Sequence, residues 1–579
     1  MNIFNDRFSE IKKASEPLYK SPKSVQETIE ILKISESGIF EVADGKYSKT
    51  YRFSDVNYAT RSEDEQESFF QRYCRCLNSF DCTFKITVNN KNKDMDVLRN
   101  EVMLKYRNDG FDKMRESYNR IIKEKILEGR QGIEQERYLT ITIERKNFEE
   151  AKAQFATIEA STFRSFAELG SKLTPLTGNE RLKILHDYYR LGREDEFNFD
   201  IRQGRITGTD FRNEICNTRI KYHLDYFEDE GKVGRVLFIK KYPTYLSDRF
   251  FTELTFLPVH SVTSVDVVPV PKDLTMKMLQ KKYLGIESDI IKQQRTRNRN
   301  NDFSSDISYA TRQKKKDIEE IMNNVRENDE SLYYVSVTMI VMSDDRDELE
   351  SICETVDSIA KGAGCAVDTC MYKQREAVNT TLPIGVRQIE TMRTMLTQSL
   401  AVLMPFNVQE LCDRNGIYYG VNQISKNIIV GNRKKLLNGN GFIFGVSGAG
   451  KSFQAKMEMG SVLLSTDDNV IAVDPMNEYE DVTEKYNGTY INISTNTRNY
   501  INPMDMDVWN LDVLDSKGWV RDKCQFMLSI CEQIMKEITP QQRSIISRCV
   551  KDLYMDIARS REKYVPTMED LYNRLLEQE

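Results

Sequence analysis

The sequence GVSGAGKS at residues 445–452 decides most of what this chain can be, because it fits the phosphate-binding pattern G-x-x-x-x-G-K-[ST] without a gap. Its glycines let the backbone turn tightly, in dihedral angles that a side chain would disfavour. The amide hydrogens of such a loop point inward and bind phosphate oxygens. Lys451 is the predicted contact to the β- and γ-phosphates, and the Ser452 hydroxyl is the predicted ligand of Mg²⁺.

The flanking sequence favours a true phosphate loop over a chance match in a glycine-containing turn. Residues 441–444, GFIF, predict a buried strand, and residues 470–473, VIAV, predict a second one. Apolar side chains at helical spacing lie between the loop and the second strand. Strand, loop, helix and strand in about 30 residues form the βαβ unit that a phosphate loop requires. The candidate nucleotide contacts are Gly445, Val446, Ser447, Gly448, Ala449, Gly450, Lys451, Ser452 and Phe453.

Nucleotide hydrolysis also needs carboxylates near the γ-phosphate, which hold Mg²⁺ and orient water. The nearest candidates are Asp474 and Glu478, which we predict to be catalytic together with Lys451. Asp474 follows the second predicted strand, at the carboxyl edge where ligands bind in parallel sheets, and Pro475 ends that strand. The alternative is that Asp474 caps the following turn and Glu478 is a surface carboxylate.

A Walker-B strand, four apolar residues ending in Asp or Asp-Glu, is expected well downstream of a phosphate loop. None follows Asp474, and from Lys523 to Glu579 the apolar pattern is helical throughout. The sequence therefore predicts a nucleotide-binding domain that is truncated before Walker B. Residues 523–535 predict one helix, and Thr539 and Thr567 each predict the N-terminal cap of another.

Composition excludes several classes of protein. The 579 residues are 40% hydrophobic and 30% charged, with a net charge of -6, which is ordinary for a globular protein and argues against coating nucleic acid by bulk charge. No stretch approaches 18 consecutive apolar residues, and the N-terminus lacks the blocks of a signal peptide. Eleven scattered cysteines and three distant histidines predict reduced thiols rather than a disulfide or metal framework.

The N-terminal two thirds of the sequence mix strand and helix patterns, which predicts an α+β domain. Strands are expected near residues 38–42, 49–53, 84–88, 137–143 and 333–341, and helices near 62–80, 97–130, 147–169 and 345–361. Residues 285–316 differ, because they are poor in apolar side chains and rich in lysine and arginine. They are either a basic arm for nucleic acid or acidic lipid, or a solvated loop that leads into a charged helix, and sparse aromatics favour the loop.

These patterns predict five segments. Residues 1–34 are a mobile lead-in, 35–284 an α+β domain, 285–316 a polar basic linker, 317–394 the second part of that domain, and 395–579 the nucleotide-binding domain with a helical insertion. The predicted fold class is thus α/β, an N-terminal α+β domain followed by a partial P-loop ATPase domain.

A family resemblance rests on five elements: PFN at 405–407, GIYYGVN at 416–422, the phosphate loop with Phe453, VDPMNEYE at 473–480 and YINPMD at 500–505. Together they resemble the conjugation ATPases of type IV secretion systems, and within these the TraE-like proteins of Gram-positive conjugative elements, in the VirB-four class. The resemblance is specific over about 395–579. It is weaker over about 35–390, where DVNY at 55–58 and the strands at 137–143 and 333–342 follow the family.

The resemblance implies a RecA-like ATPase domain of the hexameric motor type, related to the DNA-pumping FtsK and HerA proteins. Gly445, Gly450, Lys451 and Ser452 then correspond to the Walker-A residues, and Asp474 and Glu478 to a D-P-x-x-E-Y element near the nucleotide. Family members continue with Walker B, a glutamine sensor and an arginine finger, none of which is visible in this sequence.

The function expected from this resemblance is that of an ATP- and Mg²⁺-dependent motor subunit of a conjugative DNA-transfer apparatus. It would be cytoplasmic and peripheral at the inner face of the plasma membrane, held there by other channel proteins, with DNA contacted indirectly. One alternative is a DNA translocase that grips DNA directly. Another is a nucleotide-gated scaffold that assembles the channel without turnover.

Overall fold

The computed structural model describes residues 22–92, 102–128, 133–243, 245–299, 309–327, 329–408, 411, 413, 415–423, 427–494, 497, 499–511, 518–535 and 537–578. The chain divides into two compact units, Met1–Val470 and Ile471–Glu579. This division falls inside the nucleotide-binding domain predicted for 395–579, and each unit is described by itself below.

The first unit is built on a 13-stranded sheet whose main path runs β1-β2-β3-β5-β4-β10-β11-β9-β8-β7, every described pairing being antiparallel. The strands are β1 (Lys33–Ile34), β2 (Ile39–Ala43), β3 (Lys46–Phe53), β4 (Thr83–Asn92), β5 (Ile133–Glu144), β6 (Leu173–Pro175), β7 (Ile220–Tyr222), β8 (Phe227–Asp229), β9 (Lys232–Lys241), β10 (Ser261–Val270), β11 (Leu332–Ser343), β12 (Ala366–Thr369) and β13 (Arg393–Leu396). Strands from both sides of residues 285–316 therefore share one sheet.

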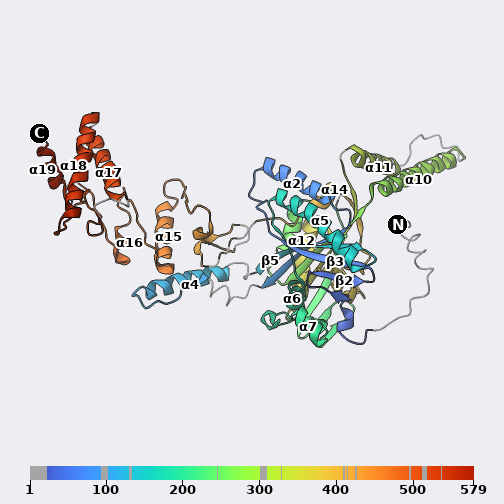
Figure 1. Ribbon diagram of the computed structural model, residues 1–579. Coiled ribbons are helices and arrows are strands. Elements are labelled where there is room, and N and C mark those ends of the chain that lie inside the picture. The colour runs from blue at the N-terminus through green and yellow to red at the C-terminus, as the bar shows by residue number, and fades with distance from the viewer. Residues whose placement is uncertain are drawn as a thin grey trace. The chain divides into compact units, whose positions relative to one another are not determined.

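Helices cover both faces of this sheet, as Figure 1 shows. One face packs against α2 (Glu63–Asn78), α5 (Phe148–Leu169), α9 (Arg249–Thr255), α12 (Arg346–Gly362) and α14 (Thr397–Ala401). The other packs against α6 (Gly178–Tyr189), α7 (Ile201–Thr207), α8 (Arg212–Ile215) and α13 (Gln374–Thr381). Because side chains alternate along a strand, Met339 and Val341 join the first core whereas Ile340 and Met342 join the second.

The strands predicted for this region are observed, and so are the helices predicted near 62–80, 147–169 and 345–361. Of the helices predicted across 97–130, α4 (Asp112–Glu128) is observed, whereas residues 103–111 are not helical. The Asp44-Gly45 turn joins β2 and β3, and Gly45 adopts a φ of +68°, which a side chain would disfavour. Helix α2 begins with a capping box between Ser62 and Glu65. Of the predicted lead-in, residues 1–21 lie outside the described residues. Residues 22–34 are not mobile, because β1 pairs with β2 and Ile31 is fully buried.

The second face carries a polar layer under residues 380–387. Ser48 and Thr50 donate to Ile384 O at 2.6 Å and Pro383 O at 3.2 Å. The buried Arg181 guanidinium donates to Ser48 O, Pro383 O and Ile384 O, and lies 3.9 Å from the Phe40 ring centroid. Backbone carbonyls thus satisfy this layer, which fixes the 380–387 segment to the sheet.

Residues 285–299 and 309–316 are helical and do not form the predicted loop, and residues 300–308 lie outside the described residues. α10 (Lys272–Arg299) and α11 (Tyr309–Glu327) form a helical pair, labelled in Figure 1. Lys315 of α11 contacts Glu287 of α10 at 3.0 Å and lies over the Tyr283 ring. Lysine, arginine and glutamine are good helix formers, so a polar composition does not by itself predict a loop.

The sequence around the phosphate loop forms a small hairpin and one helix within the first unit. β14 (Ile417–Val421) pairs with β15 (Ile428–Gly431), η3 spans Arg433–Lys435, and α15 (Lys451–Ser465) follows the loop. α4 (Asp112–Glu128), predicted as part of the N-terminal domain, packs here instead. Its Tyr118 and Ile122 share a buried cluster with Ile428 and Val430.

Two arginines of the α4 region bind the C-terminal end of α15. Arg115 is fully buried, forms ion pairs with Asp109 and Asp112, and donates to Leu464 O at 3.1 Å. Arg107 donates to Ser465 O at 2.8 Å. Cations at a helix C-terminus satisfy its last carbonyls and complement its dipole.

The second unit is helical, with α16 (Glu480–Lys485), α17 (Trp519–Met535), α18 (Pro540–Arg559) and α19 (Met568–Leu576). The predicted caps are confirmed, since Thr539 and Thr567 each form a capping box. The remaining short helices are η1 (Gln26–Thr28) and η2 (Glu194–Glu196) in the first unit. No helix among the described residues has the length and apolarity needed to cross a bilayer.

Candidate nucleotide-binding site

The phosphate loop enters α15 through two glycines in the left-handed region. Gly448 and Gly450 adopt φ angles of +79° and +86°, and Gly450 is the N-cap of the helix. A Cβ on Gly445 would come within 3.2 Å of the Ala449 Cβ and 3.3 Å of the Lys451 Cγ, so the loop closes tightly on itself there. The pattern of glycines that the motif requires is therefore explained by backbone geometry.

The helix that follows presents its amino end to the loop. The first amide bonded within this turn is that of Gln454, which donates to Gly450 O at 2.9 Å. The amides of Lys451, Ser452 and Phe453 precede it, at the positive end of the helix dipole, where N–H groups have no partner within the helix. This arrangement suits an anion such as phosphate.

Lys451 folds back over the loop. Its Nζ donates to Gly445 O at 3.0 Å and to Val446 O at 3.1 Å. The ammonium group and the helix amides are all donors, so this donor set fits a phosphate chain, and the half-buried Ser452 hydroxyl at the start of α15 fits the predicted role of a Mg²⁺ ligand.

Ion pairs hold α15 against the β14–β15 hairpin. Glu458 of α15 accepts from the Tyr419 hydroxyl at 3.0 Å and forms an ion pair with Arg433 at 2.8 Å. The next two residues pair as well, Lys434 with Asp468 at 2.6 Å and Lys435 with Asp413 at 3.0 Å. Sequence analysis missed these contacts, because a charged pair at a separation of 25 residues leaves no local pattern.

The strand predicted for 441–444 is not observed, and the prediction is wrong in this structure. Phe442 and Phe444 are 82% and 88% exposed and stack on each other at 5.6 Å. The strand predicted for 470–473 is not observed either, with Ile471 and Val473 more than 90% exposed. A strand is stable only when its amides pair with a neighbour, and no described segment pairs with either stretch.

Asp474 caps the turn after it. Its Oδ2 accepts from the amides of Glu478 at 2.7 Å and Tyr479 at 2.9 Å, and its Oδ1 from that of Met476 at 3.3 Å. Glu478 is exposed. The capping alternative is thus what the structure shows. The loop and Asp474 belong to different units, so the predicted catalytic roles of Asp474 and Glu478 remain predictions.

The YINPMD element has a structural part in the second unit. Asn502 donates to Pro566 O at 2.8 Å and accepts from the Met504 amide. Lys523 of α17 donates to Pro503 O at 3.1 Å and Asp505 O at 2.7 Å. These contacts tie the element to α17 and to the segment before α19.

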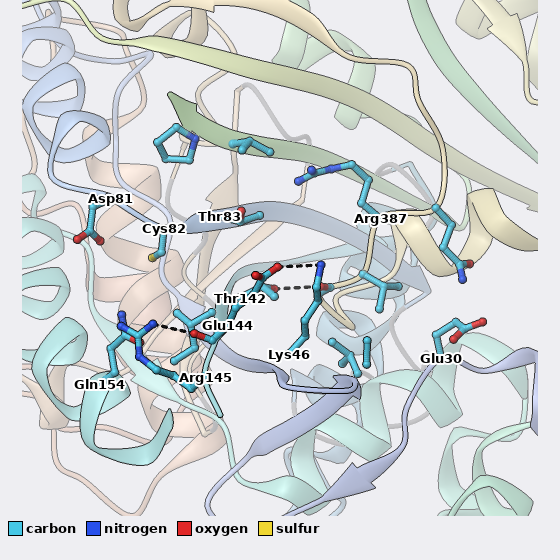
Figure 2. Close-up of a pocket in the computed structure, with 18 of the residues that line it drawn as sticks. Glu30, Lys46, Asp81, Cys82, Thr83, Thr142, Glu144, Arg145, Gln154 and Arg387 are labelled. Atoms are coloured by element: carbon cyan, nitrogen blue, oxygen red, sulfur yellow. Dashed lines mark hydrogen bonds and ion pairs between the residues drawn. The ribbon is translucent and has the colours of Figure 1, made fainter. Parts of the chain in front are cut away.

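A separate cavity of about 830 Å³ lies in the sheet domain, between the β2–β3 region and residues 385–390 (Figure 2). Two of the cations that line it are already paired with carboxylates. Lys46 pairs with Glu144 at 2.9 Å, and Arg387 pairs with the buried Asp266 at 2.9 Å. Among the described residues no group of three His, Cys, Asp or Glu side chains could hold a metal ion, and every described cysteine is a free thiol. The phosphate loop therefore remains the strongest candidate site.

Comparison with known protein families identifies the class of this site. Residues 412–578 match the family model of the TraG P-loop domain. The match includes the whole phosphate loop, α15 and nearly all of the second unit. Over these residues the chain is similar to the TraG P-loop domain, which supports a P-loop nucleotide-binding domain in this segment. The comparison with curated proteins finds no match for the chain.

Proposed function

We propose that this chain is an ATP-binding motor subunit of a conjugative DNA-transfer apparatus of the type IV secretion class. The observation that carries the proposal is the phosphate loop itself, because Lys451 and the amino end of α15 converge on it within a segment that matches a TraG P-loop domain. The RecA-like fold, the VirB-four class, a hexameric assembly and Mg²⁺ bound through Ser452 are part of this proposal.

In the proposed function, the antiparallel sheet domain docks to channel proteins and to neighbouring subunits. The chain would work at the inner face of the membrane, held there by those partners. Coupling of hydrolysis to channel assembly would require carboxylates at the γ-phosphate, and Asp474 and Glu478 are the candidates.

The test combines nucleotide binding with turnover. The purified chain should bind a fluorescent ATP analogue in the presence of Mg²⁺, and Lys451→Ala should not. In a mating assay with cells that carry the other transfer genes, wild type should support DNA transfer and Lys451→Ala should fail. ATP binding without any effect of Lys451→Ala on transfer would contradict the motor role.

A nucleotide-gated scaffold is the second candidate, and a specific observation favours it. The Asp474 carboxylate already accepts three amides of its own turn, which leaves it fewer lone pairs for a metal or water. A scaffold would bind ATP and assemble without turnover, so single-turnover hydrolysis with Mg²⁺ separates the two functions.

A further inference from the structure

A groove of about 900 Å³ runs along α4, outside the phosphate loop and its contacts. One wall is the outer face of the helix. The other is the segment 103–106, which precedes it. The residues that line the groove are Met103, Leu104, Lys105, Tyr106, Lys113, Glu116, Ser117, Asn119, Arg120 and Lys123.

The groove is held open by a specific pair of hydrogen bonds. Asn119 Oδ1 accepts from the Leu104 amide at 2.8 Å, and Asn119 Nδ2 donates to Leu104 O at 2.9 Å. The Asn119 side chain thus pairs with both backbone polar groups of Leu104, as a neighbouring strand would, and fixes segment 103–106 beside the helix. On the opposite face of α4, Arg115, Tyr118 and Ile122 are buried, so the helix cannot rotate to close the groove.

The lining is strongly cationic. Lys105, Lys113, Arg120 and Lys123 are all exposed, and Glu116 is the only acid among the residues that line the groove. Two further acids of this region, Asp109 and Asp112, form ion pairs with Arg115, and Glu124 of α4 is not among the residues that line the groove. In a chain whose net charge is -6, this is a local concentration of positive charge.

The spacing of these cations suits a polyanion with regular charges. Lys113, Arg120 and Lys123 lie seven and three residues apart and so share one helical stripe. From Lys113 to Lys123 the stripe rises about 15 Å, at about 1.5 Å per residue. At about 3.4 Å per nucleotide, that length corresponds to about four phosphates of one strand.

Tyr106 adds an aromatic surface. Its side chain is 62% exposed at the end of segment 103–106. An exposed aromatic ring beside a basic groove is the combination on which unpaired bases stack, whatever their sequence. We propose that this groove binds single-stranded nucleic acid, with the cations on the phosphates and Tyr106 against a base.

The same charges would attract an anionic membrane surface, but the groove lacks the apolar stripe that inserts between lipids. Met103 and Leu104 are its aliphatic lining residues, and both are half-buried.

Base pairs in a duplex are stacked on one another, so Tyr106 distinguishes single strands from duplexes. The proposal needs no nucleotide at the phosphate loop and stands apart from the proposed function.

The experiment measures binding of a fluorescein-labelled thymidine 20-mer to the full chain by fluorescence anisotropy. The triple variant Lys113→Glu, Arg120→Glu, Lys123→Glu should weaken binding at least tenfold. The matched control is Lys277→Glu, Lys281→Glu, Lys282→Glu on the exposed side of α10, with the same charge change, and it should stay within twofold of wild type. The slope of log K against log[salt] should be about −2.8 for four phosphate contacts and much flatter in the groove variant.

Two further sets of variants test the proposal if charge reversal disturbs the fold. The milder variant Lys113→Gln, Arg120→Gln, Lys123→Gln should melt like wild type and still bind more weakly. Tyr106→Ala should cost at least about fivefold, and Tyr106→Phe should restore binding, because stacking needs the ring and not the hydroxyl. Lys451→Ala should bind the oligonucleotide normally.

Three results would overturn the proposal. Equal losses in the groove variant and the α10 control would assign binding to bulk charge. Equal affinity for a duplex 20-mer, with no effect of Tyr106→Ala, would remove the single-strand assignment. If the groove variant no longer sediments with vesicles that contain about 30% phosphatidylserine, but binds the oligonucleotide as tightly as wild type, the groove is a lipid site.

Discussion

Two lysines of this molecule bind backbone carbonyls, and their surroundings give the two contacts opposite meanings. Lys85, on the central strand β4, donates to Thr380 O and to Val386 O, the latter at 3.1 Å, and is almost completely buried. Lys451 donates to Gly445 O and Val446 O in the open phosphate loop.

The difference lies in what could replace each contact. Burial lowers the pKa of Lys85 to about 8, although Asp266 at 3.9 Å opposes this effect. Because Lys85 is buried, no ligand can reach these carbonyls and replace it as their donor. Lys451 can exchange two carbonyls for phosphate oxygens without exposing an unpaired group. A buried cation thus stabilises a fold, whereas a half-buried one beside an open loop can bind a ligand.

The largest expected effect is on the buried member of this pair. Lys85→Met leaves the Thr380 and Val386 carbonyls without the lysine donor, so we expect it to destabilise the first unit by about 3–5 kcal/mol. Lys451→Met should change stability by less than about 0.5 kcal/mol. Urea unfolding followed by far-UV circular dichroism measures both. Equal losses of stability in the two variants would show that burial does not set the roles of the two lysines apart.

A buried histidine just before β10 gives a second test of the effect of burial, through pH. His260 is buried, its two ring nitrogens have no hydrogen-bond partner among the described residues, and burial lowers its pKa from 6.5 to about 4. The unfolded chain therefore binds the proton first as pH falls below 6.5. Stability should drop by about 3 kcal/mol between pH 6.5 and 4, and no further from this group below that.

The change that tests this is His260→Gln, which should flatten the drop over that pH range. His223 is the matched control, because it is partly exposed and paired with Glu228 at 3.0 Å. If His223→Gln flattens the profile as much as His260→Gln, burial of His260 is not its cause.

The third effect concerns the binding of ATP at Lys451. At about 100 times its Kd, ATP should stabilise the wild type by about 2.7 kcal/mol, a shift that Lys451→Ala should abolish while leaving the nucleotide-free melting temperature unchanged. Differential scanning fluorimetry with and without Mg-ATP measures both. A normal ATP-induced rise in the variant would show that the phosphate loop is not the nucleotide site.

The expected loss of stability at Asp474 is smaller than that at Lys85. Asp474→Asn loses some of the amide contacts to Met476, Glu478 and Tyr479, at a cost of about 1 kcal/mol to the second unit. If the carboxylate also acts at the γ-phosphate, single-turnover hydrolysis should fall by about 10²-fold with ATP binding retained. The surface variant Glu480→Gln is the control. Unchanged turnover in Asp474→Asn would leave it as a turn cap alone.

Features that depend only on neighbouring residues could be predicted from the sequence. The Thr539 and Thr567 capping boxes, the Asp44-Gly45 turn and the helix after Lys451 each depend on side chains within a few positions. The phosphate loop is of the same kind, since its glycines and lysine form a contiguous motif.

Features that depend on a distant partner could not be predicted. Residues 441–444 and 470–473 have strand composition, but a strand also needs a neighbour to pair with, which composition does not reveal. The same holds for Lys85, which in sequence is one polar residue in an alternating strand. Its partners at 380–386 lie almost 300 residues away.

The union of α4 with the end of α15 has a consequence for how the protein is made. Arg115 and the carbonyl that it binds are separated by 349 residues. At about 5–20 residues per second, a ribosome needs about 17–70 s to synthesise the chain between them. Throughout that interval the nascent α4 exposes Arg115 and its apolar face, because the residues that they pack against have not yet been synthesised. Packing of α4 in the nucleotide-binding region therefore has to wait until Leu464 has been synthesised, and the growing chain is an expected client of chaperones that shield such faces.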